Sequence, residues 1–255
     1  MTSNTILRLI SLLLLAVVAI PLNISAEENP SPEFKAMGVS LEWYRHEFDL
    51  NVTQVKTTFP GVSAAQMDAI KAQLDSFNDV EVVNLRLDRQ VHPYLNIFGS
   101  IGQVANTTQV GFSRLAPGVS DMEVDNDGTA YSVGATFSRQ YGKVIGSFDY
   151  IYSYINLDKN NDEIVVHSAV PSLGVLTKVG TVSLGFAYQA IEVDYSGVVT
   201  APFVGDVPVT VATENDDDIQ LLAGLHTRLA KDWYMTANVG LNGQEQLRLQ
   251  FNKRF

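Results

Sequence analysis

Apolar and polar residues alternate with a period of two over much of the chain. In the segment 181–190, the even positions carry Val, Leu, Phe, Tyr and Ala, whereas the odd positions carry Thr, Ser, Gly, Ala and Gln. The segments 129–139, 144–154, 219–229 and 233–241 show related patterns. Because successive side chains of a β-strand point to opposite sides, this alternation predicts strands with two different faces.

The two faces differ in a way that indicates where each one lies. One face is aliphatic with aromatic residues near the strand ends, and the other is polar or small and rich in Gly. A soluble β-sandwich usually carries long charged side chains on its wet face, whereas small and polar residues suit a confined interior. The pattern therefore predicts an all-β fold, an antiparallel transmembrane β-barrel with an apolar outside and a polar inside. Closure of the sheet is required in lipid because an open edge would leave backbone groups unpaired.

Counting the alternating segments gives about ten strands, an even number that places both chain ends on the same side of the barrel. The expected strands cover residues 37–48, 79–88, 93–105, 128–139, 143–156, 163–177, 180–194, 218–229, 233–241 and 244–255. If the first two are not strands, the count falls to eight. Between them, residues 64–77 carry an apolar stripe of Met67, Ile70, Leu74 and Phe77, which predicts one short helix.

The connections between these segments alternate between short and long, as in outer-membrane barrels. A type I′ turn is expected at Asn242-Gly243, on the side of the long connections. The expected short turns are Asp88–His92, Gln140–Gly142, Lys178–Gly180 and Ala230–Asp232, and the expected long loops are Thr107–Asp127, Leu157–Asp162 and Tyr195–Asp217.

The loop Tyr195–Asp217 is unusually apolar for a loop, and two of its segments alternate. Two interpretations remain open. The segment could be a hairpin that extends the barrel wall, or it could be a contact surface for a partner.

The N-terminus resembles a targeting segment rather than part of the fold. Arg8 precedes the mainly apolar run Leu9–Ile20, and after Pro21, Ile24 and Ser25 the small residue Ala26 stands at the exit. These features predict a secretory signal peptide over residues 1–26, and the run is too short for a membrane-spanning helix. The alternative is an N-terminal anchor that is not cleaved. Residues 27–255 are then a single barrel domain. After residue 27 no apolar run approaches 18 residues, which excludes a helical membrane protein.

Charge and composition remove several classes of function. The 255 residues carry a formal net charge of −11, which argues against nucleic acid as a partner. The chain has no Cys, so disulfides and thiolate metal sites are excluded.

The last strand carries a resemblance to a known family. Leu247, Leu249, Phe251 and the terminal Phe255 share one face, and polar residues occupy the other. This ending resembles that of bacterial outer-membrane β-barrel proteins, and the overall plan resembles the small OmpA/OmpX/OmpW-like barrels. The resemblance implies a multi-pass barrel in the outer membrane of a Gram-negative bacterium, assembled by the barrel-assembly machinery. It also implies contact with outer-membrane lipid and lipopolysaccharide. Lys253 departs from the pattern, which usually has an aromatic or aliphatic residue there.

Several charged and polar side chains fall on the expected interior face. They could be the lining of a narrow pore, or a network of ion pairs and hydrogen bonds that fills the interior. The candidates for the lumen lining are Glu42, His46, Arg86, Asp149, His226, Arg228 and Arg248.

Little in the sequence favours catalysis. His167 and Ser168 are adjacent and would point to opposite faces of a strand, so they could not act as base and nucleophile. No nucleophile elbow, P-loop or H-E-x-x-H motif is present. We therefore expect a non-enzymatic barrel without catalytic residues, cofactor or metal site. It would act as a structural element or as a narrow passive channel for small solutes. The alternatives are a surface-exposed interaction or adhesion protein that acts through the long loops, and a lipid-modifying enzyme that uses His46 or His226.

Overall fold

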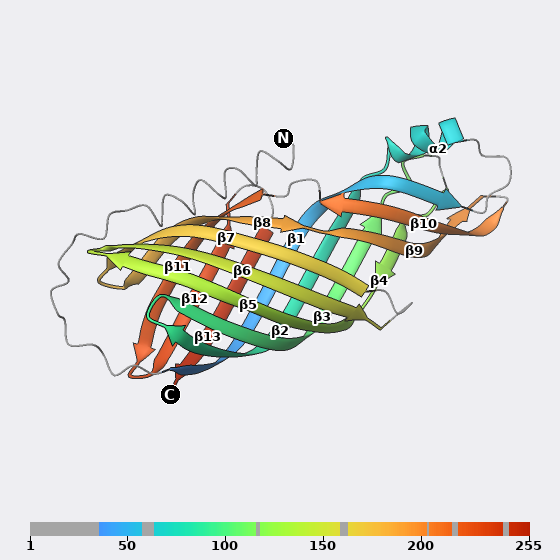
Figure 1. Ribbon diagram of the computed structural model, residues 1–255. Coiled ribbons are helices and arrows are strands. Elements are labelled where there is room, and N and C mark those ends of the chain that lie inside the picture. Colours follow the sequence, from blue (N-terminus) through green and yellow to red (C-terminus); the bar gives the residue numbers. More distant parts are fainter. Residues whose placement is uncertain are drawn as a thin grey trace.

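The computed structural model describes residues 36–57, 64–115, 118–158, 163–202, 204–215, 219–241 and 245–255, and its main body is a closed antiparallel barrel (Figure 1). The ten strands of the wall are β1 (Met37–Thr57), β2 (Ser76–His92), β3 (Leu95–Val110), β5 (Gly128–Tyr141), β6 (Val144–Leu157), β7 (Glu163–Thr177), β8 (Gly180–Ala190), β11 (Ile219–Ala230), β12 (Trp233–Gly240) and β13 (Glu245–Arg254). Pairing of β13 with β1, from Gly38–Arg254 to Glu47–Glu245, closes the barrel. The predicted fold class and the count of ten rather than eight are confirmed. The expected signal peptide lies outside the described residues.

The outer surface of the barrel is apolar, as the alternation predicts. Leu41, Leu85 and Ile101 lie opposite one another on β1, β2 and β3, and each is about half exposed, at 56%, 52% and 49%. Apolar side chains in such a continuous exposed array favour contact with lipid rather than with water. Further along β1 and β2 the indole of Trp43 donates a hydrogen bond to Glu81 (2.7 Å), and Arg45 pairs with Asp79 (3.0 Å). This polar pairing marks one edge of the apolar band.

In the described part of the chain, no helix has both the length and the apolar character needed to cross a membrane.

Two-residue turns join the strands at one end of the barrel, the end where the described chain begins and ends. Gly142 supplies a positive φ of 59° in the turn between β5 and β6, a conformation that suits glycine. In outer-membrane barrels the short turns face the periplasm, so we call this the periplasmic end. One expected turn is misplaced: Asp88–His92 belongs to β2, and the turn consists of Pro93 and Tyr94.

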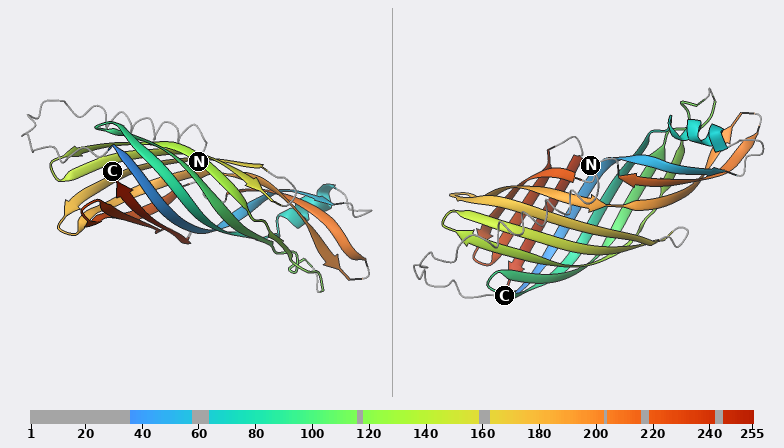
Figure 2. Two further views of the ribbon diagram at one scale, coloured as in Figure 1. Left: turned by 90° about the horizontal axis from the view of Figure 1, so that it is seen from below. Right: turned by 45° about the horizontal axis from the view of Figure 1, so that its top comes forward.

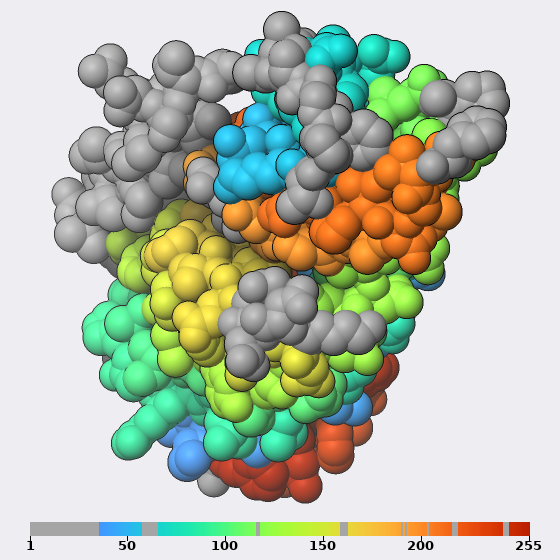
Figure 3. All heavy atoms as spheres, turned by 90° about the vertical axis from the view of Figure 1, so that its right-hand side faces the viewer, coloured from blue at the N-terminus to red at the C-terminus, as the bar shows by residue number. Residues whose placement is uncertain are grey.

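At the other end, three strands continue past the rim of the barrel and build a second body (Figure 2). Beyond Leu50, β10 (Gly205–Asn215) replaces β13 as the neighbour of β1, and β9 (Glu192–Ala201) pairs with β10. On the opposite side β4 (Met122–Asp125) pairs with the end of β3. We call β4, β9 and β10, with the adjoining ends of β1, β2 and β3, the lobe. Figure 3 views the molecule from the lobe end, with the orange β9 and β10 beside the blue end of β1.

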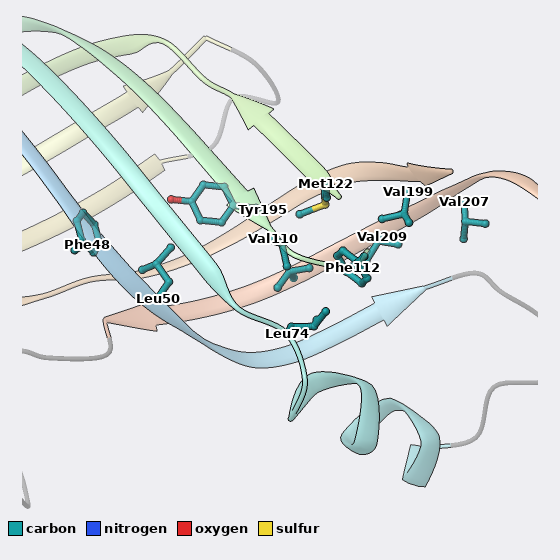
Figure 4. Packing of buried hydrophobic residues seen from close by; sticks show 11 residues of the cluster. Phe48, Leu50, Leu74, Val110, Phe112, Met122, Tyr195, Val199, Val207 and Val209 are labelled. Carbon is teal, nitrogen blue, oxygen red and sulfur yellow. The ribbon is translucent and has the colours of Figure 1, made fainter. Parts of the chain in front are cut away.

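The lobe has its own hydrophobic core, which explains why these segments are ordered as strands (Figure 4). Met122, Val110 and Val211 are fully buried there. The buried members of this core are Phe48, Leu50, Leu74, Val110, Phe112, Met122, Tyr195, Val199, Val207, Val209 and Val211.

The lobe corrects two sequence-based expectations and decides a third. The segment Thr107–Asp127 is not simply a loop, because β3 extends to Val110 and β4 lies within the segment. The helix expected over 64–77 ends early: α2 spans Ala64–Lys71, Leu74 enters the core, and β2 has already begun at Ser76. Of the two interpretations of Tyr195–Asp217, the extended hairpin is confirmed as β9 and β10. The expected turn at 242–243 lies outside the described residues.

Candidate functional site: the barrel lumen

The interior of the barrel contains a cavity of about 250 Å³. Five of the seven predicted lumen residues line it, and they come from β1, β2, β6 and β13. These five are Glu42, His46, Arg86, Asp149 and Arg248.

The cavity arises because large and small side chains line different parts of the wall. Strands β1 to β3 and β13 contribute Tyr44, Arg86, Phe98 and Arg248. About half of the lining residues on strands β5 to β8 are small, namely Ala130, Ser132, Ser153, Ser168, Ser172, Ser183, Gly185 and Ala187. The small hydroxyls bond to one another across the strands, as in Ser132–Ser153 (2.8 Å) and Ser147–Ser172 (2.7 Å). That wall therefore satisfies its own polar groups without filling the lumen.

A layer of charged residues crosses the middle of the lumen. Arg248 donates a hydrogen bond to Glu42 at 2.8 Å, and both side chains are largely buried. The guanidinium carbon of Arg86 lies 3.4 Å from the centroid of the Phe98 ring, in cation–π contact. On β6, Asp149 accepts a hydrogen bond from Thr136. Arg248 is thus ion-paired, whereas Arg86 is held mainly by an aromatic ring.

Above the charged layer, towards the lobe, the lumen becomes apolar. Val82, Val104 and Ala130 form one buried cluster, and a second cluster is built around Leu157, Ile164 and Val166. Phe48, Leu50 and Tyr195 connect this region to the core of the lobe, and all three also line the cavity. The cavity therefore has a polar lower part and a mainly apolar upper part, in which His46, Asn78 and Asn106 are the polar lining residues on β1, β2 and β3.

Below the charged layer, a compact polar cluster lies inside the wall at the periplasmic end, and we call it the floor. Asp88 is almost fully buried and pairs with Arg254 at 2.7 Å. It also accepts hydrogen bonds from Asn96 (2.6 Å) and Asn252 (3.1 Å). Asn252 donates to Ser40 at 2.6 Å. These five side chains come from the neighbouring strands β1, β2, β3 and β13 and satisfy one another's polar groups.

Two predicted lumen residues, His226 and Arg228, do not line the cavity. His226 stacks on Tyr234 with ring centroids 5.7 Å apart, and its Nδ1 lies 2.9 Å from the hydroxyl of Thr236. Arg228 donates to the carbonyl oxygens of Ala230 and Lys231 in the adjacent turn. Both residues are exposed at the periplasmic end, where they belong to the strand ends rather than to the solute space.

The histidines form no arrangement for acid–base or nucleophilic catalysis in the part of the chain that the structure describes. His167 bonds to the hydroxyl of Tyr150 (2.8 Å), while Ser168 lines the cavity on the other side of the wall. His46 packs between Tyr44 and Phe48 on β1. Among the described residues, no group of three or more His, Cys, Asp or Glu side chains could hold a metal ion.

The predicted assembly residues lie along the closing strand. Leu247, Leu249 and Phe251 pair in register with Arg45, Trp43 and Leu41 of β1, whose side chains form the outer face. Phe251 and Phe255 are exposed. The ammonium of Lys253 lies 5.5 Å from the Trp233 ring and 5.0 Å from the Phe255 ring. This position suits a long cationic side chain that bends towards the membrane edge.

No protein-family model matches the sequence, and no curated protein sequence matches it either. Among solved structures, the outer membrane protein OprG from Pseudomonas aeruginosa is similar, with 9% identity and a TM-score of 0.47 over 86% of this chain and 96% of that one. The translocator domain of the autotransporter NalP from Neisseria meningitidis shows 13% identity and a TM-score of 0.39, over 88% and 90% of the two chains. The transport unit of the autotransporter AIDA-I from Escherichia coli shows 10% identity and a TM-score of 0.40, over 96% and 97%. At TM-scores below 0.5, these similarities carry no argument about what this chain does.

Proposed function

We propose that this protein is a non-enzymatic outer-membrane barrel that acts as a narrow passive channel for small solutes, with the floor as its periplasmic gate. The observation that carries the proposal is the cavity of about 250 Å³ inside a closed wall, with the floor residues nearer the periplasmic end and outside the cavity lining. A barrel that served only as an anchor would need no such space, because a lumen of this size can be filled by side chains alone.

The construction of the floor supports a gate. Asp88, Arg254, Asn96, Asn252 and Ser40 meet through side-chain contacts. Rotation of long side chains such as Arg254 takes far less rearrangement than displacement of a backbone segment, and it occurs on fast timescales. Loss of the Asp88–Arg254 contact would therefore widen the lower lumen while leaving the wall intact.

The experiment is single-channel conductance of the refolded barrel in a planar bilayer. We expect rare openings for the natural chain and more frequent or longer openings for Asp88→Asn, which removes the negative charge that holds Arg254. The matched control is Arg89→Gln, a neighbouring and exposed residue of β2 outside the floor. If the natural chain and Asp88→Asn are both silent although inserted, the channel proposal fails.

The lobe favours a second candidate, a surface-interaction protein. The lobe is built from six strands with their own hydrophobic core, and insertion into a membrane does not require such a body beyond the rim. The lobe also exposes an apolar side chain, since Val198 of β9 is 53% exposed. Replacing residues 192–215 by a short linker should then abolish adhesion between cells that display the protein. The truncated barrel should keep its heat-dependent gel shift. Unchanged adhesion would count against this candidate.

We further propose that the C-terminal residues Leu247, Leu249, Phe251 and Phe255 are the signal read by the barrel-assembly machinery, and that outer-membrane lipid and lipopolysaccharide surround the apolar band. The exposure of Phe251 and Phe255, and the position of Leu247 and Leu249 on the closing strand, support this role. Deletion of Phe255 should lower the amount of inserted barrel in cells, whereas Lys253→Phe should not. Equal insertion of the deletion and the natural chain would contradict the assignment.

A further inference from the structure

We propose that the lumen selects small amphiphiles with an apolar body and a single carboxylate, which Arg86 binds. This inference rests on the proposed channel function, because it names the class of solute that the same cavity would take. The inference follows from the unused hydrogen-bond donors of Arg86 and from the apolar side chains that line the cavity between Arg86 and the lobe.

Arg86 is the lumen cation whose hydrogen-bonding capacity is least used. A guanidinium has five N–H donors in a planar fork that matches a carboxylate. In the described part of the chain, its Nε is buried without a hydrogen-bond partner, and no carboxylate forms an ion pair with it. The contact that holds it is the Phe98 ring at 3.4 Å. Buried polar groups nearly always have partners, so an oxygen-bearing group in the cavity would complete this site.

The other cations of the interior already have anionic partners. Arg248 is paired with Glu42 at 2.8 Å, and Arg254 is paired with Asp88 at 2.7 Å. Asp149 also lines the cavity and accepts a hydrogen bond from Thr136 of β5, and among the described residues it forms no ion pair with Arg86. The Nε of Arg248 is also buried without a hydrogen-bond partner, but its Nη2 is already paired with Glu42. Among the described residues, Arg86 is therefore the cavity arginine that has no ion pair and can offer its guanidinium to an incoming carboxylate.

The surrounding acids limit how much negative charge a solute can bring. Glu42 and Asp149 line the same cavity as Arg86. Like charges in a region of low dielectric repel strongly, so a second carboxylate on the solute would lie close to these groups without a free cation to meet it. A monocarboxylate is therefore favoured over a dicarboxylate.

The upper cavity is suited to the apolar body of such a molecule. Val82 and Val104 approach from one wall, and Leu157, Ile164 and Val166 approach from the other. An apolar cavity of about 150 Å³ is enough to hold benzene. The 250 Å³ present here can therefore hold one aromatic ring or a short alkyl chain in addition to the acid group.

The experiment is equilibrium dialysis of the full barrel in lipid nanodiscs against three probes: phenylbutyrate, the neutral phenylbutanol and the short acid propionate. We expect phenylbutyrate to bind at least tenfold more tightly than either of the others. Equal binding of the acid and the alcohol by the natural chain would overturn the proposal, and this comparison needs no variant.

Variants then locate the site. Arg86→Gln should lose the preference for the acid over the alcohol, Arg86→Lys should keep part of it, and the control Arg89→Gln should keep all of it, in samples that retain the heat-dependent gel shift. Unchanged preference in Arg86→Gln would place the carboxylate elsewhere and refute the assignment. The two proposals can fail independently. If the barrel binds the acid selectively but does not conduct, the channel proposal is refuted and the binding site stands. If the barrel conducts but shows no preference for the acid, the binding site is refuted and the channel proposal stands.

Discussion

The guanidinium carbon of Arg86 lies over the ring of Phe98 in the lumen, 3.4 Å from the ring centroid. Gly134 of β5 lies against the same ring. A Cβ atom at Gly134 would overlap Phe98 Cζ and would lie 2.5 Å from the carbonyl oxygen of Tyr150. The absence of a side chain at Gly134 therefore lets Phe98 take the place from which it supports Arg86.

Gly134→Ala should displace the Phe98 ring and destabilise the barrel by about 1–3 kcal/mol, the usual cost of overfilling a packed site. Gly99→Ala is the control, because the nearest atom to its Cβ would be the carbonyl oxygen of Ser132 at 3.7 Å. Urea titration of folding into lipid vesicles measures both free energies. Equal stabilities for the two variants would mean that Phe98 has room to move.

Leu85→Arg should destabilise the inserted barrel by about 2–4 kcal/mol, since a cation on the lipid face costs most near the midplane. Leu85 lies between Leu41 and Ile101 in the apolar band. The same change at Val91, which lies near the periplasmic turn and beyond Arg89, should cost about 0–1 kcal/mol. Folding titrations in vesicles give the difference. A cost at Val91 as large as that at Leu85 would contradict the position assigned to the band.

Met122→Ala tests whether the lobe is a packed body in its own right. Met122 is fully buried and contacts the strand β9 at Gly197. Its truncation should destabilise the lobe by about 2–5 kcal/mol and increase proteolysis of β9 and β10, while the barrel keeps its gel shift. Val198→Ala is the control because Val198 is exposed on β9. Unaltered proteolysis in Met122→Ala would show that the lobe does not depend on this core.

Alternation along the sequence was enough to predict the barrel because the membrane and the lumen impose opposite chemistry on adjacent residues. The alternation predicts strand β7 over its full length, 163–177, and it also locates the other nine strands of the wall. The strand β1 was predicted too short, because its continuation from Leu50 to Thr57 is stabilised by β10, a partner more than 150 residues away. Patterns within a strand do not reveal such pairing.

Part of the candidate site can be predicted from the sequence, because alternation shows which residues face the interior. The face of Arg86 follows from its neighbours in β2, whereas its stacking on Phe98 depends on the register between β2 and β3. Asp88 and Arg254 could be assigned to the interior, but their contact depends on closure of the barrel between β1 and β13. The sequence signal that could have located the cavity is the run of Gly, Ala and Ser on the interior faces of β5 to β8, read against the large residues of β1 to β3.

The loop between β3 and β4 should respond to acid through Asp121. Its Oδ1 accepts a hydrogen bond from the backbone N–H of Ser113 at 2.7 Å. This bond favours the charged form and lowers the pKa of the Asp121 carboxyl below its usual value. The stabilisation is therefore complete above the ordinary pKa of an aspartate and is lost as the pH falls through the lowered pKa. The amide proton of Ser113, followed by NMR during an acid titration, should shift in that window and should not titrate in Asp121→Asn. A pH-independent signal in the natural chain would contradict this contact.

Asp88 and Arg254 should be energetically coupled, because the floor depends on their contact. Removing one member of a buried, hydrogen-bonded charge pair leaves the other without its partner, at a cost of about 1–3 kcal/mol. Asp88 is only 1% exposed, and Arg254 is 24% exposed. Asp88→Asn and Arg254→Gln should thus each destabilise the barrel, and the double variant should be less destabilised than the sum of the two. Folding titrations of the four proteins give the coupling energy. The cycle Asp88→Asn with Arg89→Gln is the control, since Arg89 is exposed outside the floor and should be additive with Asp88. Additivity of Asp88 and Arg254 would mean that the ion pair does not hold the floor closed, and the gate would then have to be sought in Asn96 and Asn252.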